Sequence, residues 1–322
     1  MKKTLQILGI AAGVLAAGTT FGSGDAAASS IQPVLSGTAH QALFSIALDG
    51  KDGLAVGAGG ALLQSGDSGK TWSAVTPAPT QLSLMGADIQ QGHELAVGQL
   101  GLILVRGADG IWTKTDSGTD KRLFSVSVNA DGLAAVVGAF GTVLKSQDGG
   151  KTWTSIAPDW SKNYAPDGAQ PHLYAVEVDD KGTITMAGEF GLILRSTDGG
   201  ANWQVLHKGD ASLFALDIRA DGVGYAVGQS GTIARTADHG QTWSTMMVDG
   251  RAILLGVSSS ADGRTVITGM HDMLVSNDDG RTFRHLINPE VATSWYQGIA
   301  RSGPDSPVFA VGHSGQIIRI DG

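Results

Sequence analysis

The sequence predicts an all-β fold, a seven-bladed β-propeller of four-stranded antiparallel blades. Three observations lead to this prediction: a phrase that recurs about every 40 residues, four short strand-like segments in each copy, and a tight acidic turn before the last of them. A period of this length suits one propeller blade with its turns. Glycine accounts for 47 of the 322 residues and recurs in register, which indicates turns and not a disordered linker.

A glycine that opens the middle turn of each copy fixes the period. It recurs seven times, at Gly57, Gly98, Gly138, Gly188, Gly228, Gly269 and Gly312. The spacings are 41, 40, 50, 40, 41 and 43 residues, and the long one contains an insertion, Asp159 to Pro171. Seven copies therefore predict seven blades.

The fourth copy shows the predicted strands best. They are short, apolar and rich in β-branched residues, and they cover Leu173–Val178, Thr183–Ala187, Leu192–Ser196 and Trp203–Leu206. The seventh copy, Tyr296 to Ile320, has room for only three strands. Because Ile31–Leu35 resembles the fourth strand of a copy, we predict that this N-terminal segment completes the last blade. That pairing closes the ring and removes an exposed sheet edge.

Residues 1–28 have the pattern of a secretory signal peptide, which leaves 29–322 as a single propeller domain. Lys2 and Lys3 form a basic start, Leu5–Ala17 is apolar, and Ala26–Ala28 offers a small-residue cleavage site. An uncleaved membrane anchor is the alternative, but the apolar run is short for a bilayer span. We expect a periplasmic or secreted protein whose mature chain has no transmembrane segment.

The composition excludes several classes of function. The chain has no cysteine, so disulfides, thiolate catalysis, Cys-ligated zinc and iron–sulfur clusters are excluded. Cleavage at the predicted site leaves 20 basic and 29 acidic residues, and a net-acidic protein is unsuited to nucleic acid. No phosphate loop, nucleophile elbow or His-rich metal spacing is present. We therefore expect no cofactor, no metal and no nucleic-acid partner.

The acidic turns follow the pattern Ser-x-Asp-x-Gly-x-Thr-Trp, known as the Asp box. The copies begin at Ser65, Ser146, Ser196, Thr236 and Ser276. In a tight hairpin, the Asp and Ser oxygens can bond the N–H groups of their own turn, and the glycine can adopt a positive φ. The aromatic residue can then pack between sheets. We expect these carboxylates to maintain the architecture and to bind neither calcium nor a substrate.

The segment Gly191–Gly200 with Asn202 and Trp203, and the segment Ala226–Ile233, resemble the Asp-box (BNR-like) propellers of the photosystem II stability and assembly-factor family. The resemblance covers Leu43 to Gly322. It implies a non-enzymatic assembly chaperone that binds a membrane protein from its extracytoplasmic side. The chain departs from the photosynthetic bacterial members in lacking a lipoprotein cysteine, so the resemblance does not extend to a lipid anchor.

We place the predicted partner-binding surface on the face shared by the strand 2–3 turns and the strand 4–1 connections. These segments vary between blades, whereas the Asp boxes are nearly uniform, and function concentrates in variable loops. Register also puts Leu100 and Lys121 on this face. The candidate residues are Arg122, Phe140, Trp160, Tyr164, His172, Glu189, Phe190, Gln229, His271, Trp295 and His313. Alternatively, Phe140 and Phe190 fold back onto the blade edge and Trp160 fastens its own loop.

A second candidate is a basic column at one equivalent position of strand three. Its members are Lys145, Arg195, Arg235 and Arg319. Such a column could bind an anion or an acidic peptide. The alternative is the solvated face of an amphipathic strand, paired with neighbouring carboxylates.

These observations predict a monomeric, non-catalytic scaffold or assembly factor whose partner is a protein of a membrane or envelope complex. The alternatives are a sialidase-like glycoside hydrolase and a glycan-binding propeller. A sialidase-like site needs three arginines, a Tyr–Glu pair and an Asp acid, yet no arginine precedes Arg106. Glu189 with Asp159 or Asp167 is the one carboxylate pairing that an enzyme could use.

Overall fold

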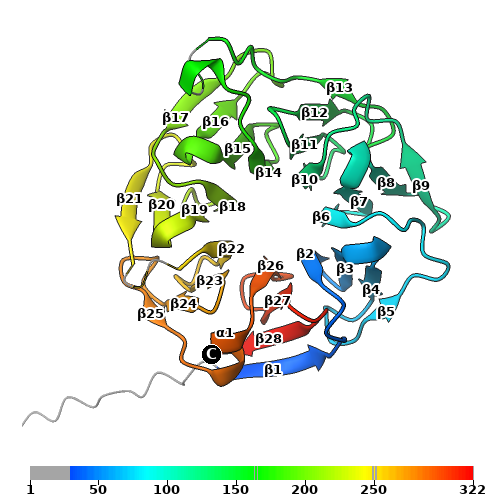
Figure 1. Cartoon of the computed structure of the whole chain (residues 1–322), viewed down its shortest axis with the longest axis vertical. Helices are drawn as coiled ribbons and strands as arrows, with labels where there is room; N and C mark the ends of the chain where they lie inside the picture. The colour runs from blue at the N-terminus through cyan, green and yellow to red at the C-terminus, as the bar shows by residue number, and fades with distance from the viewer. Residues whose placement is uncertain (1–29, 163, 165, 249, 251, 322) are drawn as a thin grey trace, which may run out of the picture.

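The computed structural model describes residues 30–162, 164, 166–248, 250 and 252–321. Seven four-stranded antiparallel sheets stand around a central axis like the blades of a propeller (Figure 1). This confirms the predicted fold. The predicted signal peptide, residues 1–28, lies outside the described residues.

Each blade runs outward from an innermost strand. Blade 1 contains β2 (Leu43–Asp49), β3 (Asp52–Gly57), β4 (Leu62–Ser65) and β5 (Ser73–Ala74). Blade 2 contains β6 (Leu84–Gln90), β7 (His93–Gly98), β8 (Ile103–Arg106) and β9 (Trp112–Thr115). Blade 3 contains β10 (Leu123–Val128), β11 (Ala134–Gly138), β12 (Val143–Ser146) and β13 (Thr154–Ser155). Blade 4 contains β14 (Leu173–Val178), β15 (Ile184–Gly188), β16 (Ile193–Ser196) and β17 (Gln204–His207).

The remaining blades repeat this order. Blade 5 contains β18 (Leu213–Ile218), β19 (Gly224–Gly228), β20 (Thr232–Thr236) and β21 (Ser244–Met247). Blade 6 contains β22 (Leu254–Ser259), β23 (Thr265–Gly269), β24 (Met273–Ser276) and β25 (Arg284–His285). Blade 7 contains β26 (Tyr296–Ala300), β27 (Val308–Gly312), β28 (Ile317–Asp321) and β1 (Ser30–Leu35). One-turn 3₁₀ segments are η1 (Ala58–Gly60), η2 (Gln99–Gly101), η3 (Pro166–Gly168), η4 (Glu189–Gly191) and η5 (Gln229–Gly231).

Strand β1 closes the ring, as predicted. It pairs antiparallel with β28, opposing Ile31 to Ile320, and becomes the outermost strand of the last blade (Figure 1). Ile31 packs against the apolar cluster that contains Ile320, while Val34 and Leu35 pack against the cluster at the blade 1 boundary. The first and last strands are therefore joined by both a hydrogen-bond ladder and apolar contacts.

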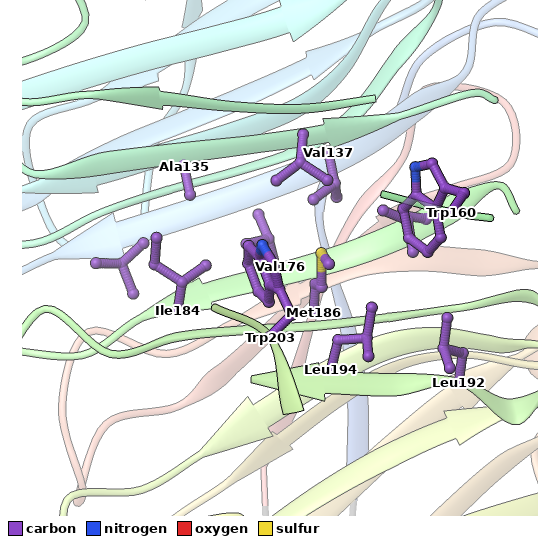
Figure 2. Packing of buried hydrophobic residues seen from close by; sticks show 12 residues of the cluster. Ala135, Val137, Trp160, Val176, Ile184, Met186, Leu192, Leu194 and Trp203 are labelled. Atoms are coloured by element: carbon purple, nitrogen blue, oxygen red, sulfur yellow. The ribbon is translucent and has the colours of Figure 1, made fainter. Parts of the chain in front are cut away.

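The core lies between neighbouring blades. The second strand of blades 3 to 7 is buried along its whole length, because each of its faces packs against an adjacent sheet. Figure 2 shows one such cluster between blades 3 and 4, with Val137, Met186 and Leu194 at its centre. Full burial of one such aliphatic side chain contributes about 1.5–3 kcal/mol, so each inter-blade layer stabilises the two blades it joins.

The Asp boxes use their carboxylates within their own turns. In the first, the Asp67 carboxylate accepts from the Thr71 N–H at 2.9 Å, from the Thr71 hydroxyl at 2.6 Å and from the Ser65 hydroxyl at 2.9 Å. The same bonds recur at Asp148, Asp198, Asp238 and Asp278, with Asn202 replacing Thr in blade 4. The predicted architectural role of the box is therefore seen in its bonds.

One helical element was not predicted. Helix α1 (Pro289–Thr293) lies in the connection between blades 6 and 7, where Asn288 caps it by accepting from the Glu290 N–H at 2.8 Å. Its five residues are too few to produce a helical period in the sequence. Within the described residues, no helix has the length and apolar character needed to cross a membrane.

Carboxyl groups on the innermost strands join neighbouring blades. Asp88 accepts from the Val128 N–H at 2.8 Å, Glu177 from the Ile218 N–H at 2.9 Å, and Asp217 from the Ser259 N–H at 2.7 Å. Burial raises the pKa of Asp88 to about 6 and raises the pKa of Glu177 and Asp217 as well. Conversely, the hydrogen bond from the Thr71 hydroxyl lowers the pKa of Asp67 to about 2, and the bond from Thr282 does the same for Asp278.

These opposite shifts predict a stability maximum at about pH 4, the pKa of a carboxyl group in the unfolded chain. Above the unfolded-state pKa of about 4, the folded protein holds the Asp88 proton more tightly, so the unfolding free energy falls as the pH rises through about 6. Below about pH 4 the boxes lose stability, because Asp67 and Asp278 must be protonated as the pH falls toward about 2. Urea unfolding between pH 2 and pH 8 measures both arms.

Asp88→Asn is the matched variant, because its amide oxygen can still accept from Val128. It should flatten the arm above pH 4 by an amount on the order of 3 kcal/mol or less, and leave the acid arm unchanged. If the stability of Asp88→Asn depends on pH in the same way as that of the wild type, Asp88 does not cause the loss of stability above pH 4.

Candidate functional site

Backbone hydrogen bonds assign the turns to two faces. Each strand 2–3 turn bonds to the segment entering the innermost strand: the Gln99 N–H donates to Ser83 O at 3.0 Å and the Ala139 N–H to Arg122 O at 2.8 Å. The Asp-box turns bond instead to the strand 1–2 turns, as the His239 N–H does to Gly222 O at 2.9 Å. We call the face with the strand 2–3 turns and the strand 4–1 connections the variable face. The face with the Asp-box turns and the strand 1–2 turns is the Asp-box face.

Large exposed apolar side chains gather on the variable face. Among the described residues there are seven. Five belong to strand 2–3 turns or strand 4–1 connections, namely Leu100, Phe140, Ile253, Met270 and Ile287, and Met247 ends the strand β21 that leads into such a connection. The seventh, Ile111, lies in the strand 3–4 hairpin of blade 2 on the opposite face. The variable face therefore carries most of the large exposed apolar side chains and is the candidate surface for binding.

A groove of about 570 Å³ lies on this face over blades 2 and 3. It brings together three predicted residues, Arg122, Phe140 and His172, with Leu100, Lys121 and Phe124. Leu100 and Phe140 occupy the same turn position in adjacent blades and are 65% and 58% exposed. The groove therefore offers two apolar groups and two cations, of which Lys121 also pairs with the exposed carboxylate of Asp120 at 3.3 Å.

His172 fixes one wall of the groove. Its Nδ1 accepts from the Phe140 N–H at 3.1 Å, and the two rings meet edge to face with centroids 4.9 Å apart. The His172 N–H in turn donates to Glu189 Oε2 at 2.8 Å. On the other side of the Phe140 ring, Lys121 Nζ lies 5.8 Å from the centroid, within cation–π range.

The exposed apolar groups are held in a conformation that favours glycine. Leu100, Phe140 and Phe190 have φ of 55°, 53° and 60°, and the equivalent residue of blade 1 is Gly59 at 62°. A left-handed conformation costs a residue with a side chain roughly 1–2 kcal/mol. Smaller or polar residues such as Ser68, His239 and Asp279 adopt positive φ on the Asp-box face, so the large apolar side chains at this strained position are what distinguish the variable face.

The other predicted residues lie elsewhere on the variable face. Gln229 is exposed and its Oε1 accepts from the Ser212 N–H at 3.0 Å, and His271 is exposed in the strand 2–3 turn of blade 6. Trp295 and His313 are half-buried, with ring centroids 6.3 Å apart. Glu189 and Phe190 are half-buried in η4. Thus the structure gathers three of the predicted residues in the groove and distributes the others around the ring.

The predicted place of Trp160 and Tyr164 in the binding surface is corrected. Trp160 is only 7% exposed, and its Nε1–H donates to Gly141 O at 3.1 Å. Figure 2 shows Trp160 at one end of the blade 3–4 cluster, and Tyr164 packs against the same cluster with its hydroxyl 3.4 Å from Trp203 O. The insertion is therefore fastened to the core by its own aromatics, and we exclude both residues from the binding surface.

The predicted anion-binding role of the basic column is also corrected, because three of its four members donate hydrogen bonds to the next blade. Lys145 Nζ donates to Gly199 O at 2.7 Å, Arg195 Nη1 to His239 O, and Arg235 Nε to Asp279 O at 2.8 Å. Each acceptor is the fourth residue of the Asp box in the next blade. Arg319 pairs with Asp321 at 2.7 Å in its own strand. The cations thus bind neighbouring carbonyl and carboxylate groups, which leaves no open anion site.

The carboxylates considered for hydrolysis are engaged locally. Glu189 accepts from His172, and Asp159 accepts from the Ser161 hydroxyl at 2.6 Å and pairs with Lys162 at 3.4 Å. The Ser161 hydroxyl lowers the pKa of Asp159, which is opposite to what a general acid needs. Within the described part of the chain, no group of three His, Asp or Glu side chains could hold a metal ion.

Phe124 and Lys121 complete the groove but were not among the candidate residues. Lys121 lies beside Arg122 in the sequence and was noted only as part of this face. Phe124 is the second residue of β10, and the corresponding residues Phe44, Tyr174 and Phe214 are also aromatic. This aromatic repeat at the start of the innermost strands is the signal that could have found Phe124.

Comparison with known proteins gives one family and one fold. A family model described as Photosynthesis system II assembly factor YCF48 matches residues 104–266, half of the chain. No curated protein sequence matches the chain. The solved structure described as YCF48 bound to D1 peptide has a TM-score of 0.70 and 17% identity, covering 91% of this chain and 97% of that one.

Two further solved structures show how widely the fold is shared. YCF48 from Cyanidioschyzon merolae has a TM-score of 0.70 and 19% identity, covering 90% of this chain and 98% of that one. Virginiamycin B lyase from Staphylococcus aureus has a TM-score of 0.72 and 11% identity, covering 91% and 99%. At these identities the likeness shows the fold alone, and an assembly factor and a lyase share it.

Arg235→Ala should lower the unfolding free energy by about 1–2 kcal/mol, because it leaves the Asp279 carbonyl without its donor. Arg281→Ala is the matched control: this exposed cation lies in the same hairpin as the acceptor. The control should change stability by less than about 0.5 kcal/mol. If urea unfolding shows the same loss of unfolding free energy for both variants, the basic column contributes only surface charge.

Phe140→Gly should be more stable than Phe140→Ala by about 1 kcal/mol. Both variants lose the ring contact with His172, but only glycine adopts the φ of 53° without strain. Thermal unfolding of the two variants measures the difference. Alanine equal to or better than glycine would show that the turn is not strained at this residue.

Proposed function

The chain belongs to the family of the photosynthesis system II assembly factor YCF48, and we propose that it is a non-catalytic, extracytoplasmic assembly factor. In this proposal it holds a segment of a membrane-associated protein on its variable face. Family membership supports the class of function. One solved structure with this fold is described as YCF48 bound to D1 peptide, and this description supports a peptide segment as the ligand.

The single observation that carries the proposal is the groove over blades 2 and 3. Lys121 and Arg122 supply positive charge, and Leu100 and Phe140 supply exposed apolar surface beside it. Binding energy at protein interfaces concentrates in a few aromatic and arginine residues that are desolvated together. A segment with an acidic and an apolar residue complements this arrangement.

The rest of the chain supports binding in preference to a reaction. The Asp-box carboxylates are bonded within their own turns, Asp159 is bonded within its loop, and Glu189 accepts from the N–H of His172 in the segment that enters β14. The predicted export signal supports an extracytoplasmic location.

Site-directed photo-cross-linking tests the proposal. A benzophenone amino acid replaces Leu100 in the full chain, irradiation is done in the native envelope, and the cross-linked partner is identified by mass spectrometry. Ile111 is the matched control position, because it is 59% exposed against 65% for Leu100 but lies on the Asp-box face. We expect one membrane-associated protein to be labelled from position 100 and not from position 111.

Arg122→Ala in the Leu100 cross-linking variant should lower the yield about tenfold. Arg281→Ala, a cation on the opposite face, should leave the yield unchanged. Equal labelling from positions 100 and 111, or a yield that does not depend on Arg122, would contradict the proposal.

A further inference from the structure

The second residue of every innermost strand lines the central channel. Four of these residues are aromatic, Phe44, Phe124, Tyr174 and Phe214, and Met85, Leu255 and Gln297 fill the other blades. All seven are half-buried, whereas the residue before each is buried in the core. Six large apolar side chains therefore keep part of their surface open to the channel.

Three of the rings form a continuous arc on adjacent blades. The centroids of Phe124 and Tyr174 are 5.5 Å apart, and those of Tyr174 and Phe214 are 5.0 Å apart. We call Phe124, Tyr174 and Phe214 the aromatic arc. Burial and the nearby Glu189 carboxylate raise the pKa of Tyr174 to about 12, so the arc carries no charge at neutral pH.

The arc is continuous with the groove. Phe124 lines both the groove and the channel, and His172 contacts Phe140 at 4.9 Å, Phe124 at 6.1 Å and Tyr174 at 6.3 Å between ring centroids. A segment that occupies the groove therefore meets the arc as its next apolar surface.

The size of the channel limits what it can accept. The hollow within the ring measures about 160 Å³, against about 570 Å³ for the groove. A cavity of about 150 Å³ holds one benzene molecule. The channel thus has room for one side chain and not for a polypeptide strand.

Two hydroxyl groups in the channel already have partners. Ser45 Oγ accepts from the Ala87 N–H at 3.1 Å and Ser125 Oγ from the Val176 N–H at 3.3 Å, each across a blade boundary. The carboxyl of Glu177 belongs three residues further along β14 than Tyr174, about 10 Å away along the strand. Glu189, the carboxylate beside Tyr174, already accepts from the His172 N–H at 2.8 Å, so a side chain held at the arc meets mainly rings.

We propose that the channel mouth is a second subsite, in which the aromatic arc binds one aromatic side chain of the segment held in the groove. The inference rests on the proposed function and names the ligand more closely: an extended segment with an acidic residue for Lys121 and Arg122 and an aromatic residue for the arc. Edge-to-face contact with the existing rings adds binding energy beyond that from the apolar area that the side chain buries.

Synthetic peptides test the subsite. Fluorescein-labelled 14-residue peptides of glycine, serine and asparagine carry one Glu-Glu pair and a single phenylalanine placed one to six residues after it. Matched peptides carry alanine, tyrosine or lysine in its place, and fluorescence anisotropy gives the Kd of each. We expect phenylalanine or tyrosine at one separation to bind about tenfold more tightly than alanine, and lysine to bind no better than alanine.

Two alanine variants and two conservative variants of the arc locate the gain. Tyr174→Ala and Phe214→Ala should bring the phenylalanine peptide to the affinity of the alanine peptide, whereas Tyr174→Phe should keep the tenfold difference. Phe214→Leu, which preserves apolar packing, should lose only part of it. Unchanged circular dichroism and thermal unfolding show that the variants are folded.

The outcomes separate this inference from the proposed function. If the alanine peptide binds and Arg122→Glu abolishes its binding, but phenylalanine adds nothing, the groove stands and the subsite is wrong. A gain that survives in Tyr174→Ala and Phe214→Ala, or tighter binding of the lysine peptide, also overturns the subsite. If the wild type binds none of these peptides, the proposed ligand chemistry of the groove and the subsite both fail.

Discussion

Closure of the ring by β1 and β28 is the contact on which the remaining structure depends. It joins segments from the two ends of the described chain, so the seven inter-blade layers form a closed circle. Every blade therefore packs between two neighbouring blades. A closed ring also fixes the spacing of the innermost strands. The width of the channel is therefore set by the number of blades, whereas the groove beside it is shaped by the turns and connections of blades 2 to 4.

The two faces use their polar groups differently. On the Asp-box face, carboxylates, hydroxyls and strand-three cations bind the turns and each other: the Asp279 N–H donates to Gly263 O within its blade, while its carbonyl accepts from Arg235 of the preceding blade. Groups committed in this way are poor candidates for binding a ligand, because a ligand would have to displace structural bonds. On the variable face, Lys121, Arg122 and Phe140 retain accessible surface.

Stability and binding make opposite demands at the strand 2–3 turns. Glycine suits their left-handed conformation, and blade 1 has Gly59 there, yet blades 2 to 4 carry Leu100, Phe140 and Phe190. These residues lower stability without filling the core, since Leu100 and Phe140 are more than half exposed. A binding role for the variable face accounts for that cost, as is common where function is placed on a rigid scaffold.

The sequence by itself determined the features that depend on local pattern. The seven blades, the completing strand Ile31–Leu35 and the Asp-box turns were predictable because strand alternation, turn glycines and a carboxylate bound by its own hairpin involve residues close in sequence. Tertiary structure alone decided which side chains remain free. Trp160 is buried and Lys145, Arg195 and Arg235 are bonded because a neighbouring blade supplies the partner about 20 to 55 residues away in the chain. The groove likewise exists because the packing of consecutive blades 2, 3 and 4 places Leu100, Arg122 and His172 side by side, and no periodicity within one blade encodes that contact.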